Sequence, residues 1–279
     1  MDQTLQGTAR LDLILDRWPE WQPQPAVKPT LVKKLAGFSN ANYLVSDGAR
    51  RYVVRVNRNA THLGVDRSVE HLILNDIAGT SFSPRIVFVG EDALVTAHID
   101  GIHPVTVDPG AMGRLFSAIH STPTSVTRRL DPDVHLATYF DNLPAPVDPH
   151  LISALHAVRS APPVETGEPC LCHNDLLMEN VLDTGNALVV IDWEYACLGE
   201  PAFDIAALAE TYNLDETQTT ALLSAYGHPG LAPRLAHFRN IFALINVLWW
   251  LQNGRDIEDF SEVLDKLCAT GTPGSSQLQ

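Results

Sequence analysis

The sequence predicts an α+β protein in which a small β-rich part comes first and a larger, mainly helical part follows. Three observations support this class. The chain has 279 residues, of which 45% are hydrophobic, so a substantial core can form and the length allows two domains. Short runs of strand-like composition dominate as far as residue 97. Longer runs with helical spacing dominate beyond residue 103.

In the first part, the apolar spacing predicts a short helix at residues 11–18 that ends at Pro19. A second helix is expected at residues 68–78, with Ser68 as its N-cap and Gly79 after its end. The buried face of that helix should carry Val69, Leu72, Ile73 and Ile77.

The strands of the first part are expected to form a small antiparallel sheet. They are predicted at residues 31–35, 42–45, 52–56, 86–89 and 93–97. The second and third should be joined as a hairpin, because Asp47-Gly48 between them is a typical turn sequence.

Beyond Asp100-Gly101 the pattern becomes helical. Helices are predicted at residues 112–120, 150–159, 205–212, 217–226, 234–251 and 257–267. A strand-turn-strand interrupts them at residues 181–191, turning through Asp183-Thr184-Gly185-Asn186. These patterns predict a first lobe at 1–97, a hinge at 98–103, a second lobe at 104–270 and a disordered tail at 271–279.

Charge and hydropathy exclude several classes of partner. The formal net charge of -14 argues against nucleic acid, which needs Lys and Arg to displace counterions, and is more compatible with a cationic ligand. The first ten residues contain Asp2 and no apolar run, so no secretory or transit peptide is expected. The apolar segment 241–251 is shorter than the roughly 20 residues of a membrane span and is interpreted as a buried helix. We therefore expect a cytoplasmic protein without a membrane partner.

Four cysteines, Cys170, Cys172, Cys197 and Cys268, form no CxxC pair. Free cysteines are usually buried, so all four are expected to be ordinary packed thiols. A metal-binding pair at Cys170 and Cys172 is the alternative, but the sequence shows no matching partner ligands for it.

The segment from Cys172 to Glu194 carries the clearest chemistry. If Gly185 closes a hairpin, Asn180 before its first strand and Asp192 after its second both lie at the open end. Mg²⁺ prefers such oxygen ligands, so Asn180 and Asp192 are predicted to bind it. Asp175, on the loop that enters the hairpin, would then accept a proton from an attacking hydroxyl.

Other interpretations of this segment exist. An isolated His-x-Asp or an Asp at a strand end is common and usually structural. A metal hydrolase with His173, Asp175 and Asp192 as ligands is a second alternative. That alternative leaves the β-rich first part without a role.

The first part supplies candidates for phosphate binding. In the strand 52–56, Arg55 should point away from the face that buries Val54 and Val56, and Glu70 on the next helix is its expected ion-pair partner. Two solvated surface charges are the alternative. Ser39 and Asn40 lie in a turn of the sequence Gly-Phe-Ser-Asn-Ala-Asn, whose backbone N–H groups could approach phosphate, although a plain β-turn would look the same.

These motifs resemble the choline/ethanolamine kinase branch of the aminoglycoside-phosphotransferase-like, protein-kinase-like superfamily. The resemblance covers residues 35–252 and rests on residues 37–43, the strand 52–56 with Arg55, His173-Asn174-Asp175 with Asn180, residues 191–196 and residues 201–206. Asn174 favours this branch, because antibiotic-modifying relatives more often have Gly there. The resemblance implies a two-lobed protein-kinase-like fold, with ATP at the hinge near Thr96, His98 and Ile99. It also implies Asp175 as base, Mg²⁺ on Asn180 and Asp192, and a structural role for Asp204.

The acceptor implied by this resemblance is choline, ethanolamine or another cationic alcohol. A quaternary ammonium is bound through aromatic faces and nearby carboxylates. The candidates are Glu194, Tyr195, Glu210, Tyr212, Trp249 and Trp250. Aromatic residues at helical spacing are also typical of a packed core. Kinases for thiamine, an aminoglycoside or a sugar remain alternatives, as does a non-catalytic binding protein, and the sequence sets no oligomeric state.

Overall fold

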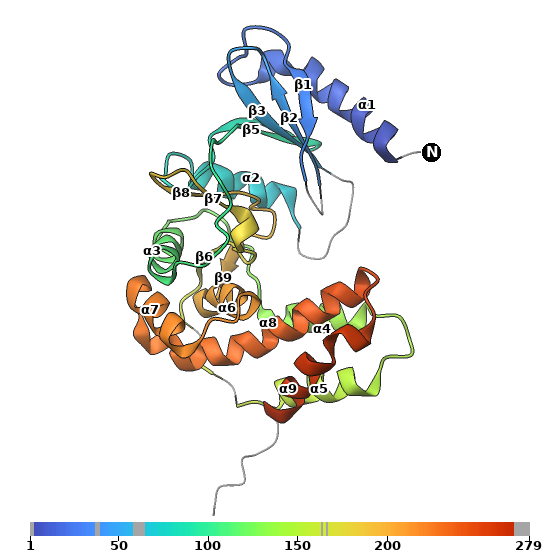
Figure 1. The fold of residues 1–279 in the computed structure, drawn as a ribbon, viewed down its shortest axis with the longest axis vertical. Coiled ribbons are helices and arrows are strands. Elements are labelled where there is room, and N and C mark those ends of the chain that lie inside the picture. The colour runs from blue at the N-terminus through green and yellow to red at the C-terminus, as the bar shows by residue number, and fades with distance from the viewer. Residues whose placement is uncertain (1–2, 37–39, 58–64, 163, 166, 271–279) are drawn as a thin grey trace, which may run out of the picture. The chain divides into compact units, whose positions relative to one another are not determined.

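The structure is a computed structural model that describes residues 3–36, 40–57, 65–162, 164–165 and 167–270. The chain divides into two compact units (Figure 1). Unit 1 comprises Met1–Pro104 and Glu179–Glu194, and unit 2 comprises Val105–Met178 and Tyr195–Gln279. The sequence alone assigns residues 179–194 to the second lobe, whereas their contacts group them with unit 1. The predicted disordered tail, 271–279, lies outside the described residues.

Unit 1 contains a five-stranded antiparallel sheet within the described residues, in the order β1-β2-β3-β5-β4. Its strands are β1 (Thr30–Lys34), β2 (Ala41–Ser46), β3 (Arg51–Val56), β4 (Ile86–Val89) and β5 (Ala93–Ala97). The predicted hairpin between β2 and β3 is present, and the Asp47 carboxylate accepts hydrogen bonds from the backbone N–H groups of Ala49 and Arg50. Together with a helical unit 2, this sheet confirms the predicted α+β class.

One face of the sheet packs against α1 (Gln3–Asp16), which lies along it in Figure 1. Leu11, Ile14 and Leu15 of this helix join the same buried cluster as Val54 and the other inward-facing strand residues. The helix is longer than predicted. The helix ends at Asp16, and a short 3-10 turn, η1 (Trp18–Glu20), follows it. The predicted end of the helix, at Pro19, lies within this turn.

The second helix of unit 1, α2 (Arg67–Asp76), differs from the prediction in its cap and its buried face. Asp66, not Ser68, is the N-cap, and its carboxylate accepts hydrogen bonds from the N–H groups of Ser68 and Val69. Leu72 is 46% exposed, whereas Glu70, Ile73 and Leu74 are buried. Ile73 and Ile77 are buried as predicted, but the inward face also includes the charged Glu70, which the apolar pattern alone did not indicate.

The strand-turn-strand of the second half is confirmed as β7 (Val181–Asp183) and β8 (Leu188–Val190), which pair antiparallel. Gly185 has φ of 79°, a left-handed conformation that suits glycine. The N–H of Ile191 donates to the carbonyl oxygen of Asn180 at 2.9 Å, which extends the pairing beyond the strand ends. The short 3-10 turn η2 (Met178–Asn180) leads into the hairpin.

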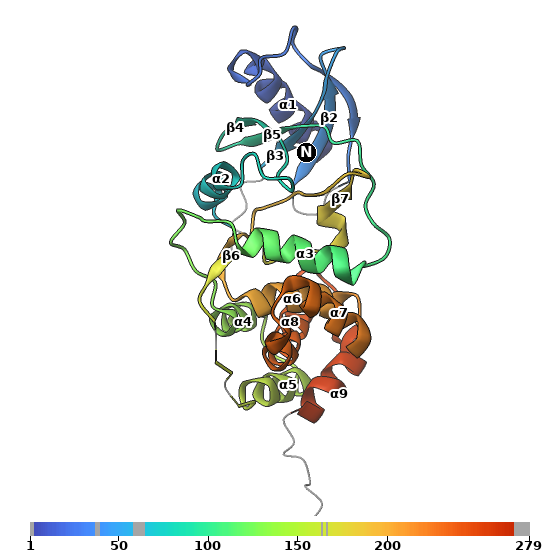
Figure 2. The ribbon, with the colours of Figure 1, turned by 90° about the vertical axis from the view of Figure 1, so that its left-hand side faces the viewer.

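Unit 2 is mainly helical, with α5 and α9 at the end opposite α3 (Figure 2). Its helices pack as the pairs α3 with α7, α6 with α8, α4 with α8 and α5 with α9. They are α3 (Pro109–His120), α4 (Pro132–Asp141), α5 (Pro149–Arg159), α6 (Pro201–Thr211), α7 (Glu216–Tyr226), α8 (Ala232–Gln252) and α9 (Ser261–Thr270), with 3-10 turns η3 (Pro229–Leu231) and η4 (Ile257–Phe260). Two short strands, β6 (Cys170–Cys172) and β9 (Cys197–Gly199), pair antiparallel.

Several elements of unit 2 were not predicted correctly. Helix α4 and strands β6 and β9 were not predicted, and the single helix expected at 257–267 is divided into η4 and α9. The expectation of a buried helix at 241–251 is confirmed by α8, in which Ile241, Leu244 and Leu248 are buried. No helix among the described residues is long and apolar enough to cross a membrane.

Candidate active site

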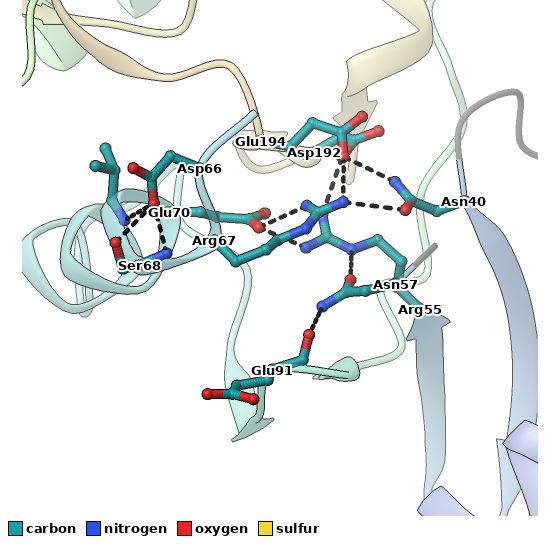
Figure 3. A network of polar contacts seen from close by, with 11 residues as sticks. Asn40, Arg55, Asn57, Asp66, Arg67, Ser68, Glu70, Glu91, Asp192 and Glu194 are labelled. Carbon is teal, nitrogen blue, oxygen red and sulfur yellow. Dashed lines mark hydrogen bonds and ion pairs between the residues drawn. The ribbon is translucent and has the colours of Figure 1, made fainter. Parts of the chain in front are cut away.

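The predicted ion pair between Arg55 and Glu70 is present (Figure 3). Arg55 lies on β3, where alternation sends Val54 and Val56 into the core and its own side chain to the opposite face. Its Nη2 donates to Glu70 Oε2 at 2.6 Å, and both side chains are nearly inaccessible to solvent. The Arg55 Nε also donates to Asn57 Oδ1 at 3.1 Å, which fixes the plane of the guanidinium.

Asp192 contacts the same guanidinium. Arg55 Nη1 donates to Asp192 Oδ1 at 3.0 Å. Asp192 has φ of 63°, a left-handed conformation that is uncommon for residues other than glycine and is often found at functional sites. Burial raises the pKa of Asp192 to about 6, with the Arg55 guanidinium opposing the shift.

A second guanidinium, Arg67, lies beside the first (Figure 3). It binds Glu70 Oε2 and Glu194 Oε2, each at 2.8 Å, and it donates to Asn40 Oδ1 at 3.1 Å. Asn40 Nδ2 in turn donates to Glu194 Oε2 at 2.8 Å. Sequence reasoning missed Arg67. Glu194, which is predicted to bind the acceptor, contacts Arg67 and Asn40, and its role stays a prediction.

The electrostatics of the Arg55–Glu70 pair favour the ionised form of both side chains. Burial by itself lowers the pKa of Arg55, but the charge of Glu70 and its hydrogen bond outweigh burial, so the pKa is raised. Burial likewise raises the pKa of Glu70, but Arg55 and then Arg67 outweigh it and the pKa is lowered. The Arg55 guanidinium stays charged in a buried setting, a property that suits it to bind phosphate.

The residues predicted to bind Mg²⁺ fit that ion chemically. Asn180 and Asp192 lie at the same open end of the β7–β8 hairpin, because Asn180 faces Ile191 across the pair. Both offer hard oxygen atoms, and Mg²⁺ is usually held by one or two protein ligands together with phosphate oxygens and water. Their roles stay predictions.

The residues predicted to contact nucleotide at the hinge lie at the end of β5 and just after it. Thr96 pairs with Val53 across the sheet, which places it on the same face as Arg55. Burial lowers the pKa of His98. Thr96, His98 and Ile99 are half-buried. Of the two predicted phosphate-turn residues, Asn40 is described above and Ser39 lies outside the described residues.

Asp175 belongs to unit 2, in a loop that one buried carboxylate holds in place. Asp204, fully buried on α6, accepts hydrogen bonds from the N–H groups of His173 and Asn174, both at 2.8 Å. Asn174 has φ of 62°, and its side-chain amide donates to the Tyr195 carbonyl oxygen at 3.0 Å. The structural role expected for Asp204 therefore has a direct geometric basis.

Tyr139, on the unpredicted helix α4, is a neighbour of Asp175 that the sequence did not indicate. Burial, and secondly the charge of Asp175, raises the pKa of Tyr139 to about 12. The ring is 5% exposed and packs edge-on against His135, with centroids 4.9 Å apart. Tyr139 thus lies close enough to Asp175 for the charge of that carboxylate to act on its hydroxyl group.

The remaining acceptor candidates are already engaged within unit 2. Glu210 is bound by Arg239 at 2.8 Å and is 3.7 Å from Lys266. The Tyr212 hydroxyl accepts a hydrogen bond from the Met178 N–H at 2.9 Å.

The two tryptophans of α8 contact each other edge-on, with ring centroids 4.7 Å apart. Arg255 lies over the ring of Trp250 at 5.3 Å from its centroid. Arg255, Asp259 and Phe260 line a hollow with Trp250. The backbone carbonyl of Tyr195 accepts the hydrogen bond from Asn174, in the loop that carries Asp175, as described above.

Comparisons with known proteins show which proteins this chain resembles. Protein LicA of Haemophilus influenzae is 46% identical over 55 residues, which are 20% of this chain and 21% of that protein. A LicA homolog of Metamycoplasma hominis is 32% identical over 92 residues, 33% of this chain and 36% of that protein. The matches therefore span little more than a third of these curated relatives at most.

Solved structures show the same fold. The choline kinase LicA from Streptococcus pneumoniae superposes with a TM-score of 0.75 and 20% identity, covering 93% of this chain and 97% of that one. The resemblance to choline/ethanolamine kinases and the protein-kinase-like fold class are thereby confirmed. The model of the phosphotransferase enzyme family matches residues 32–238, more than half of the sequence. This chain therefore belongs to the phosphotransferase enzyme family.

Proposed function

We propose that this protein is an ATP-dependent, Mg²⁺-dependent kinase that phosphorylates the hydroxyl group of a small amino alcohol, with choline or ethanolamine as its acceptor. Family membership supports phosphoryl transfer over the metal-hydrolase alternative. We further propose that the protein acts in the cytoplasm and that neither nucleic acid nor a membrane is its partner.

The observation that carries this proposal is the Arg55 cluster. A buried guanidinium is held by Glu70 at 2.6 Å and contacts Asp192, the predicted metal ligand, at 3.0 Å. An anion of high charge, such as a triphosphate, can replace carboxylate partners at the guanidinium edge that faces Asp192. The same arrangement of a cation, a helix carboxylate and a metal-binding Asp serves nucleotide phosphates in protein kinases.

Asp175 is proposed to act as base. It would hold the acceptor hydroxyl in line with the γ-phosphorus and take its proton as the new O–P bond forms. The bond from the γ-phosphorus to the β,γ-bridging oxygen breaks, and ADP leaves. Mg²⁺, when bound by Asn180 and Asp192, would neutralise charge on the phosphates. Asp204 fixes the backbone that carries Asp175 and takes no part in the chemistry.

The choice of an amino alcohol rests on the relatives. The S. pneumoniae protein that shares this fold is named as a choline kinase. Tyr139, Tyr195, Tyr212 and the two α8 tryptophans supply aromatic rings, and aromatic faces attract quaternary ammonium groups. Asp175 adds a negative charge beside Tyr139.

A kinase for a different small alcohol is the second candidate, and two observations favour it. The face of Trp250 is covered by Arg255, and Glu210 is paired with Arg239, so neither group presents itself to a cation without a rearrangement. An uncharged acceptor, such as a sugar, would need neither group.

Measurement of ADP release across a panel of acceptors tests the proposal. Purified protein with Mg-ATP is offered choline, ethanolamine, thiamine, an aminoglycoside and a sugar, each against a no-acceptor blank. The proposal expects the highest kcat/KM for choline or ethanolamine. A preference for one of the other alcohols would replace the acceptor assignment and leave the kinase assignment standing.

An isosteric pair of variants tests the base. Asp175→Asn removes the proposed proton acceptor, and the expected loss in kcat is about 10²–10⁴-fold. Asp133→Asn changes an exposed acid on α4 of the same unit and is expected to leave kcat unaltered. If both variants retained wild-type turnover, Asp175 would not be the base.

A further inference from the structure

Outside the proposed active site, unit 2 brings together three metal-ligating side chains from separate parts of the sequence. His120 ends α3, whereas Cys170 and Cys172 form the ends of strand β6. One ring nitrogen of His120 and the two sulfur atoms all lie within 4.8 Å of one another. The cysteine pair for which the sequence offered no partner therefore has one in the folded protein.

The spacing of the two sulfurs fits a tetrahedral ion. Cys170 and Cys172 are two residues apart on one strand, so their side chains project from the same face. Their sulfurs are 3.8 Å apart. Two sulfurs at the usual Zn–S distance of about 2.3 Å, separated by a tetrahedral angle, would also lie about 3.8 Å apart. Binding would therefore require little movement of the strand.

His120 is oriented in the way that metal-bound histidines usually are. Its Nε2 lies 3.1 Å from Asp204 Oδ2, and Nδ1 lies 3.0 Å from the hydroxyl of Tyr226. Metal ligands of this type commonly donate the other ring N–H to a carboxylate. If Nε2–H donates to Asp204, the Nδ1 lone pair accepts the tyrosine O–H, and the hydroxyl would give up this hydrogen bond when Nδ1 binds a metal ion.

We propose that His120, Cys170 and Cys172 form a binding site for one thiophilic divalent cation of the Zn²⁺ class. Two thiolates neutralise the charge of such an ion, which limits the cost of burying it. Each thiol releases its proton to solvent when its sulfur binds. Cys172 is fully buried and Cys170 is half-buried, so the ion would enter on the side of Cys170.

The pKa values of the two thiols are shifted in opposite directions. A hydrogen bond from Cys172 lowers the pKa of Cys170, whereas burial raises the pKa of Cys172. Burial raises the pKa of the Tyr226 hydroxyl, and the neighbouring cysteines add to this effect. The hydroxyl therefore remains a neutral group beside the site.

The location gives the site a structural consequence. Strand β6 continues directly into His173 and Asn174, whose backbone N–H groups bind Asp204, the carboxylate that also contacts His120. An ion bound to Cys172 would therefore be held by the residue that directly precedes the loop that carries Asp175. Metal binding is expected to raise the thermal stability of the protein by mass action.

Titration with Cd²⁺ under a phosphine reductant tests the proposal without reference to kinase activity. Thiolate–Cd²⁺ bonds give an ultraviolet charge-transfer absorption, and the wild type should saturate it at one ion per chain. Zn²⁺ should displace the Cd²⁺ and remove the absorption. Absence of the absorption in reduced wild-type protein would overturn the proposal.

Matched variants locate the ion. Cys170→Ser removes one ligand at the accessible end of the cluster and should weaken Cd²⁺ binding by about tenfold or more. Cys268→Ser removes the cysteine on α9, which lies outside the cluster, and should bind as the wild type does. Tyr226→Phe should retain binding, because the hydroxyl is not a ligand. Circular dichroism checks that each variant is folded. Equal affinities for Cys170→Ser and wild type, or loss of binding in Cys268→Ser, would contradict the proposal.

Discussion

Glu70 of unit 1 and Asp204 of unit 2 are buried carboxylates that each lie at the centre of a polar network, and the two networks are built from different partners. Glu70 of unit 1 is 1% exposed and binds the side chains of Arg55 and Arg67. Asp204 of unit 2 is fully buried and binds two backbone N–H groups and the ring of His120. The Glu70 network thus joins long side chains to one another. The Asp204 network joins a side chain mainly to the main chain.

Because of this difference, the Glu70 network can bind a ligand, whereas the Asp204 network holds a loop in position. Guanidiniums on long side chains can exchange one carboxylate for a phosphate without any change in the backbone. Backbone N–H groups cannot exchange partners unless the loop itself moves, so Asp204 fixes the conformation of residues 173–174. Variants in the Asp204 network should therefore affect folding first, and variants in the Glu70 network should affect ligand binding as well.

The largest effect is expected for Asp204→Ala. Removal of the carboxylate leaves two buried N–H groups and His120 without their acceptor, so we expect a loss of about 3–5 kcal/mol in the free energy of unfolding. Urea denaturation followed by circular dichroism measures this loss. Turnover should fall with it, because the loop that carries Asp175 loses its anchor.

The conservative variant Asp204→Asn sharpens this result. Its amide oxygen can accept one of the two N–H groups, but its NH₂ group cannot accept the other. An intermediate loss is therefore expected. If Asp204→Ala were as stable as the wild type, the backbone hydrogen bonds would not hold the loop, and the contrast between the two networks would fail.

The next largest effect is expected for Glu70→Gln. The amide keeps an acceptor oxygen but loses the charge opposite Arg55, and we expect about 2–3 kcal/mol of lost stability together with a higher KM for ATP. The folded protein lowers the pKa of Glu70 from its ordinary value of 4.5. Its stabilisation is therefore present above pH 4.5 and is lost as the pH falls below that value. The variant should lose less stability over that acid range than the wild type.

Glu91→Gln is the matched control, since Glu91 is exposed and contacts the network only through its backbone carbonyl. Its stability should stay within about 0.5 kcal/mol of the wild type. Identical unfolding curves and identical KM values for the two glutamine variants would show that Glu70 does not support Arg55.

The strands and the first hairpin were predictable because local signals agree with the fold. All five strands of the sheet were predicted, and β4 and β5 have the predicted bounds. The predicted starts of the helices were less accurate, although the sequence contains a signal for three of them. Asp-Pro begins α3, α4 and α5, with the Asp as N-cap and Pro at the first position. This dipeptide could have indicated α4, which carries Tyr139 beside Asp175.

The site was predictable where residues are close in sequence or fixed by register. The pairing of Arg55 with Glu70 follows from a strand and the helix after it, and the hairpin brings Asn180 and Asp192 to one end. Arg67 gave no such signal, because an Arg three residues before a Glu on a helix is most often a surface pair. His120 was equally unpredictable, since only tertiary packing brings it to β6.

A smaller effect is expected for Arg67→Met, which keeps the length of the side chain and removes its charge. Glu70 retains Arg55, and Glu194 retains Asn40, so no carboxylate is left without a described partner. We expect a loss of about 1–2 kcal/mol in stability. If Arg67 contributes to phosphate binding, its removal also raises the Kd for Mg-ATP, which isothermal titration calorimetry measures. An unchanged Kd would assign Arg67 to the structural part of the network.

The smallest effect is expected for Tyr226→Phe, at the outer edge of the Asp204 network. The hydroxyl makes one hydrogen bond, to His120 Nδ1 at 3.0 Å, and the ring stays packed against the imidazole in the variant. One neutral hydrogen bond contributes about 1 kcal/mol, so the urea midpoint should fall only slightly. His120 keeps its contact with Asp204, and turnover should match the wild type. A loss of stability as large as that of Asp204→Ala would mean that the tyrosine, and not the carboxylate, organises this network.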